Sequence, residues 1–149
     1  MHWPRSKATF DACPKIVWAA RTEGRNFMYT ENEFYGSRNL FYLETNRINL
    51  KYLLGVLNSS LYKYYMDQKL KHLGALLQLD KGQIVKVPIF NPEGQCQKPI
   101  IALVDKILAA KAKDAQADTS ELESQIDTLV YDLYGLTKDE IALVENKNK

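Results

Sequence analysis

The spacing of the apolar residues changes near residue 50 of this chain. Before that point, three short runs rich in β-branched and aromatic residues are separated by polar connections that contain glycine. This pattern predicts short β-strands, at residues 16–20, 26–30 and 40–44. Beyond Asn49 the apolar residues recur every three or four positions, which predicts an amphipathic helix; its stripe is Leu50, Leu53, Leu54, Leu57, Leu61, Tyr64 and Tyr65. Asn49 suits the N-cap, since its side-chain oxygen can accept from an unpaired amide of the first turn.

The two periods together predict an α+β fold, with a small mixed β-sheet and a central amphipathic helix. Residues 71–83 are punctuated by glycine and are predicted to be irregular. Residues 84–90, "IVKVPIF", are predicted to form a further strand that ends at Pro88 and the turn sequence "NPEGQ". These elements make up an α+β body, which we assign to residues 1–98.

A second segment, residues 99–149, is predicted to be helical. Pro99 fits the first turn of a helix, and "AKDAQADT" is a polar break after it. Ser120 has capping-box spacing to Glu123 for the next helix, which should end at Gly135 because glycine tolerates the left-handed conformation. A second capping box, Thr137 and Glu140, introduces a short terminal helix. The segment therefore predicts a helical hairpin that packs on the body or on a partner.

The charge is distributed unevenly along the chain. The net charge is +2, but residues 1–98 hold 14 Lys/Arg against 8 Asp/Glu, and residues 99–149 hold 6 against 10. This asymmetry indicates that a polyanion would meet the first part, although a merely hydrated surface explains it equally well. No apolar run is long enough to span a membrane, and the first residues lack a secretory signal. Cys13 and Cys96 are far apart without a CxxC pair, which favours reduced thiols and a cytoplasmic location.

The sequence gives little support to a catalytic or metal centre. His2 and His72 are the only histidines, and no glycine-rich phosphate loop is present. The carboxylates Glu123, Asp127 and Asp132 are interpreted as the solvated face of a helix. We therefore predict no catalytic residue, no metal and no cofactor for this chain.

Three connections carry side chains suited to DNA. Arginine presents a planar fork of donors that matches phosphate oxygens and guanine, and asparagine can pair with adenine. The candidate DNA-binding residues are Arg21, Arg25 and Asn26 on the first connection, Ser37, Arg38 and Asn39 on the second, and Lys69, Lys71 and His72 after the central helix. If the three connections meet on one rim, they form a basic edge suited to duplex DNA. The other reading, hydrated loop residues beside ordinary core aromatics, stays open on spacing alone.

The order of several stretches resembles a known family. These stretches are "HWPRS", "PKIVWAARTEGRNFMY", "FYGSRNLFYLE", "LKYLLGVLNSSLYKYYM" and "VKVPIFNP". Together they resemble the C-terminal target-recognition (specificity) domain of restriction–modification enzymes of the adenine-N6 DNA methyltransferase type, including TaqI-like and fused type IIG enzymes. The domain is related to the halves of type I specificity subunits.

The resemblance implies a division of labour within a larger enzyme. In that family a separate N-terminal domain binds S-adenosylmethionine and carries an Asn-Pro-Pro-aromatic motif, whereas this chain has only "NPE" at residues 91–93. The chain is then expected to be a non-catalytic piece whose partners are double-stranded DNA and the methyltransferase or endonuclease part of the parent protein. The alternatives are a protein-interaction adaptor that uses its helical hairpin, and, more remotely, a small nuclease.

Overall fold

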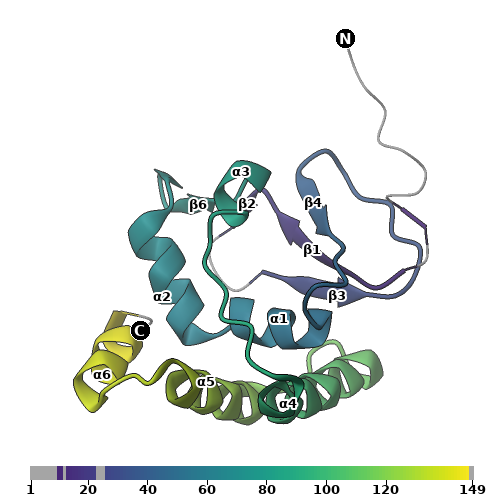
Figure 1. Ribbon diagram of the computed structural model, residues 1–149. Coiled ribbons are helices and arrows are strands. Elements are labelled where there is room, and N and C mark those ends of the chain that lie inside the picture. The colour runs from purple at the N-terminus through teal and green to yellow at the C-terminus, as the bar shows by residue number, and fades with distance from the viewer. Residues whose placement is uncertain (1–9, 12, 23–25, 148–149) are drawn as a thin grey trace.

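A computed structural model of the chain describes residues 10–11, 13–22 and 26–147. Its elements are β1 (Lys15–Ala19), β2 (Arg21–Thr22), β3 (Met28–Thr30), β4 (Leu40–Leu43), α1 (Leu50–Leu57), α2 (Ser60–Lys69), β5 (His72–Leu73), β6 (Leu76–Gln78), α3 (Lys81–Ile84), α4 (Gly94–Lys113), α5 (Ser120–Tyr134) and α6 (Lys138–Lys147). The strands lie on one side of the molecule and α4, α5 and α6 on the other, with α1 and α2 between them (Figure 1). The predicted α+β class is confirmed.

The described strands form two antiparallel sheets, where the sequence predicted one mixed sheet. The first has the order β3-β1-β4 and the second the order β2-β6-β5. The chain passes from one sheet to the other at Ala20, whose N–H donates to the carbonyl of Asn39 (2.7 Å) and whose carbonyl accepts from Leu79 (2.8 Å). These two bonds hold the start of β4 and the end of β6 beside the junction between β1 and β2.

The second sheet corrects two expectations about residues 71–90. The segment predicted to be irregular contains the β5–β6 hairpin, which turns at Gly74 with a φ of 66°, a value that glycine adopts without a Cβ clash. The strand predicted from "IVKVPIF" is wrong. Ile84 ends the short helix α3, and Val85 keeps helical angles (φ −68°, ψ −14°). Pro88 then lacks the N–H that a ladder needs.

The central helix is two helices with a break at Asn58 and Ser59. Asn49 caps α1 as predicted, since its side chain accepts from the amides of Lys51 and Tyr52. Ser59 has extended backbone angles (φ −69°, ψ 157°), and its hydroxyl accepts from the amide of Tyr62 (3.4 Å), so it starts a new helix. The stripe of apolar residues continues through the break, which is why the sequence pattern did not reveal it.

Asn58 ties this break to the first sheet. Its Oδ1 accepts from the amide of Phe27 (3.2 Å), and its Nδ2 donates to the carbonyl of the same residue (2.9 Å). Because Asn58→Ala leaves both backbone groups of Phe27 without these partners, we expect the free energy of unfolding to fall by about 1–3 kcal/mol. Urea denaturation measures this loss. Asn32→Ala, at an exposed turn, is the matched control and should change stability by less than about 0.5 kcal/mol.

The C-terminal helices belong to the same core as the sheets. Ile100, Val104, Ile126 and Val130 are buried in one apolar cluster with Trp18 and the α1 leucines. The Tyr62 hydroxyl of α2 lies 2.6 Å from that of Tyr134 in α5. Burial, reinforced by this contact, raises the pKa of Tyr62 above its ordinary value, so its hydroxyl stays protonated and available for hydrogen bonding. The predicted helical hairpin is confirmed, and its apolar face packs on the body.

Some of the helix caps predicted from the sequence for this segment are observed in the structure, and others are not. Gly135 ends α5 with a φ of 66°, and Thr137 and Glu140 exchange the two bonds of a capping box. The other two helix starts differ from prediction. Ser120 is the first helical residue, and its amide donates to Asp118 (2.9 Å). Helix α4 begins at Gly94 and contains Pro99 in its interior. The division of the chain at residue 98 stays a prediction.

Candidate nucleic-acid interface

A row of polar side chains crosses the outer face of the second sheet. Arg21 on β2 is paired with Gln78 on β6, and the amide of Gln78 donates to the carbonyl of Lys71 (2.9 Å). Directly opposed residues of antiparallel strands present their side chains on the same face. The neighbouring pair, Thr22 and Leu77, is buried on the opposite face. Arg21, Gln78 and Lys71 therefore lie side by side on the face that meets solvent.

The second predicted loop adjoins this row. A shallow depression of about 300 Å³ is lined by residues that include Arg21, Asn39 and Gln78. Arg38 precedes Asn39 in an exposed turn. We call Arg21, Arg38, Asn39, Lys71 and Gln78 the cationic edge. Figure 1 shows β2, β6 and the start of β4 near one another, on the side away from α4, α5 and α6.

The charge of Arg21 is available to a ligand. Arg21 is exposed, and no residue in the described part of the chain forms an ion pair with its guanidinium group. Asp80 is the nearby carboxylate, and its oxygens accept from the amide of Gln83 (3.0 Å) and from Nε2 of Gln78 (3.3 Å). Asp80 therefore caps α3 and holds the Gln78 amide. The edge combines fixed positive charge with oriented amide donors, which is the chemistry that phosphates and base edges require.

Other predicted residues lie elsewhere. Asn26 donates to the hydroxyl of Thr22 (2.6 Å), which is buried beneath the second sheet. His72 is paired with Leu77, and its Nε2 lies 2.9 Å from the carbonyl of Asp67 in α2. Asn26 is therefore half-buried on the inner side of the sheet, and His72 shares the face of Leu77 but remains exposed.

Three further predicted residues complete the set. Lys69 is exposed in the last turn of α2, and Ser37 is exposed, with its hydroxyl 3.4 Å from the amide of Asn39. Arg25 lies outside the described residues. Gln78 was not among the sequence candidates, because β6 was not recognised as a strand and "LLQ" shows no alternation of apolar and polar residues.

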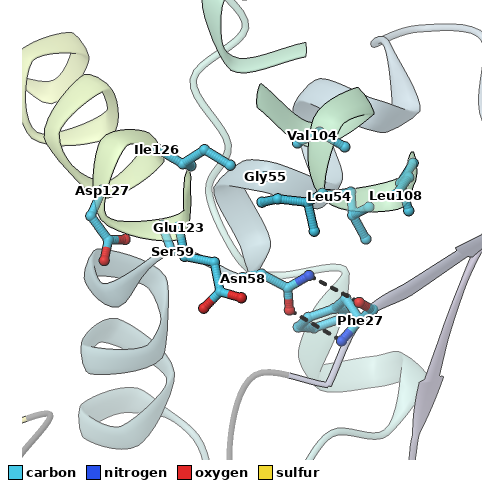
Figure 2. Close-up of a pocket in the computed structure, with 11 residues that line it drawn as sticks. Phe27, Leu54, Gly55, Asn58, Ser59, Val104, Leu108, Glu123, Ile126 and Asp127 are labelled. Atoms are coloured by element: carbon cyan, nitrogen blue, oxygen red, sulfur yellow. Dashed lines mark hydrogen bonds between the residues drawn. The ribbon is translucent and has the colours of Figure 1, made fainter. Parts of the chain in front are cut away.

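A second hollow of about 290 Å³ lies between α1, α4 and α5 (Figure 2). Glu123 and Asp127 line it, so they are half-buried there and do not form the solvated face that was predicted. Both carboxylates have structural partners: Asp127 accepts from the amide and hydroxyl of Ser60 (2.7 and 2.6 Å), and Glu123 from the hydroxyl of Thr119 (2.8 Å). Each of these two carboxylates therefore binds a group at the start of a helix, Asp127 at α2 and Glu123 at α5.

The described part of the chain contains no group of three or more His, Cys, Asp or Glu side chains that could hold a metal ion. Among the same residues, none of the helices has the length and apolar character needed to cross a bilayer. What the described residues present to a ligand is a surface of cations and amides on an α+β support. Such a surface is typical of a binding domain.

The family model of the TaqI-like C-terminal specificity domain matches residues 2–89, which is more than half of the chain, so the chain belongs to this family. A search of curated proteins finds no match. The chain is thus a DNA specificity domain of the kind found in restriction–modification enzymes, a part that binds DNA, associates with the rest of the enzyme and is non-catalytic in general. The matched region contains both sheets and the whole cationic edge.

Proposed function

We propose that this chain recognises a particular duplex DNA sequence on behalf of a type II restriction–modification enzyme, and that the cationic edge is its DNA-binding surface. The observation that carries the proposal is the row formed by Arg21, Gln78 and Lys71 beside Asn39. Arg38 and Lys71 would hold phosphates, and Arg21 and Asn39 would reach base edges. The acidic helix α5 lies on the other side of the molecule, so its carboxylates do not oppose the approach of DNA (Figure 1).

The parent activity that we propose is site-specific adenine-N6 DNA methylation, accompanied by cleavage where the parent protein carries an endonuclease part. S-adenosylmethionine would serve the methyltransferase part, and we assign no cofactor to this chain, whose sequence lacks the Asn-Pro-Pro-aromatic motif. We place the complex in the cytoplasm, where the DNA lies. The alternative, an adaptor that works through the helical hairpin, has less support because the buried residues of α4 and α5 already belong to the core.

The affinity for DNA should depend strongly on salt. Each neutralised phosphate contributes about 0.9 to the slope of log K against log salt, so the two phosphate contacts of Arg38 and Lys71 predict a fall of roughly 12-fold between about 50 and 200 mM. Fluorescence anisotropy with the full chain and a labelled random-sequence duplex measures this. The adaptor hypothesis predicts no binding at either concentration. Binding that is indifferent to salt would reject the assignment of phosphates to the cationic edge.

A further inference from the structure

The β5–β6 hairpin presents more than charge on its outer face. Gln78 and Leu76 lie on that face because they are two residues apart on β6, and Leu73 is the pairing partner of Leu76. The tip of the hairpin is therefore apolar on the same face that carries Arg21 and Gln78. Leu73 is 53% exposed. Exposure of an apolar side chain to water is unfavourable, so this leucine is free to be buried by a ligand. The position indicates an apolar contact with a ligand.

The amide of Gln78 is held in one orientation. Its Nε2 donates one hydrogen to Asp80 (3.3 Å), which leaves the second N–H and the carbonyl oxygen for another partner. One donor and one acceptor side by side match N7 and N6 of adenine in the major groove. A two-stranded ribbon fits that groove, which is about 12 Å wide. An exposed leucine on the same face suits the 5-methyl group of thymine, which projects into the same groove.

We infer that the outer face of the β5–β6 hairpin reads A·T pairs, with Gln78 as the residue that selects adenine and Leu73 as the residue that contacts a thymine methyl. Asp80 is a positioning residue, since it orients the Gln78 amide. This inference rests on the proposed function and adds to it the kind of base that is read and the residues that read it. The residue that reads the base then lies on strand β6, whereas the candidates from the sequence lay on the connections between elements.

The first step of the test selects duplexes from a random-sequence pool with the full chain. The preferred site is expected to contain at least one A·T pair that tolerates no substitution. Failure to retain any duplex overturns the proposed function, and the inference with it. A preferred site composed of G·C pairs alone overturns the inference but leaves DNA recognition standing.

The second step removes single atoms from the preferred site. Replacing the contacted thymine by deoxyuridine removes one methyl group and should weaken the binding of the wild-type chain about fourfold. The same replacement should not change the affinity of the Leu73→Ala variant. Replacing the contacted adenine by 7-deazaadenine should weaken wild-type binding about tenfold and should not affect Gln78→Ala. If each modified base weakens binding by the variant as much as by the wild type, the inference is overturned, while DNA recognition itself stands.

A third variant is expected to change which base is preferred, and not only to weaken the affinity for DNA. Gln78→Glu keeps the size of the side chain but removes both N–H donors, so it should reject adenine N7 and accept from the amino group of cytosine. Repeating the selection with this variant is expected to exchange adenine for cytosine at one position. An unchanged preferred site contradicts the role of Gln78, and circular dichroism confirms that each variant is folded.

Discussion

Replacing Arg21, Arg38 and Lys71 together by alanine is expected to weaken binding to the preferred duplex at least about 100-fold at moderate salt. Each contact with a base or phosphate contributes about 1–3 kcal/mol, and three losses on one surface accumulate. The three residues are exposed, so the variant should remain folded. Anisotropy titration measures the affinity, and the slope of log K against log salt should become shallower by about 1 for each lost phosphate contact.

The matched control removes the same charge from other surfaces. Arg47, Lys106 and Lys138 are exposed and lie outside the cationic edge, in the loop after β4, on α4 and on α6. Replacing these three by alanine should change the affinity less than about threefold, an effect of net charge alone. If both triple variants weaken binding equally, a general attraction explains the affinity and the cationic edge is not the site.

Trp18→Ala is expected to lower the free energy of unfolding by about 3–5 kcal/mol, the range for truncating a large buried aromatic residue. Trp18 is 2% exposed, lies 5.7 Å from the Phe41 ring between centroids, and donates from Nε1 to the carbonyl of Leu79 (2.8 Å). It thereby ties β1 of the first sheet to the residue that follows β6 in the second. Its loss should loosen the support of Gln78 as well as the core.

Urea denaturation followed by far-ultraviolet circular dichroism measures this effect without a tryptophan signal. Tyr35→Ala is the control, because that ring is 65% exposed and its removal should cost less than about 0.5 kcal/mol. Trp18→Phe should fall between the two, since it restores part of the packing but not the hydrogen bond. A loss below about 1 kcal/mol for Trp18→Ala would show that the junction between the sheets does not depend on this residue.

The sequence predicted the elements whose signals are local. The cap at Asn49, the glycine stop at Gly135 and the capping box at Thr137 depend on side chains within one turn, and all three are confirmed. The break at Asn58 and Ser59 combines the local cap at Ser59 with a contact to Phe27, a residue 31 positions before Asn58, whose backbone binds the Asn58 amide. Pairing of this kind has no local signature, so a continuous apolar stripe concealed two helices.

The same distinction explains the candidate site. Residue type directed attention to the segments that hold Arg21, Asn39 and Lys71, and the structure places these three residues around one edge. Residue type did not indicate that His72 points to α2, because strand alternation decides that and the strand was not recognised. Gln78 was missed for the same reason. The register of a very short sheet therefore decides which donors share a face.

The most direct test is a nuclear magnetic resonance titration of the ¹⁵N-labelled chain with its preferred duplex. The account predicts that the largest amide shifts fall at residues 20–22, 37–40 and 71–78, and that they weaken as salt is added. Shifts confined to α4, α5 and α6, with the second sheet unchanged, would contradict it.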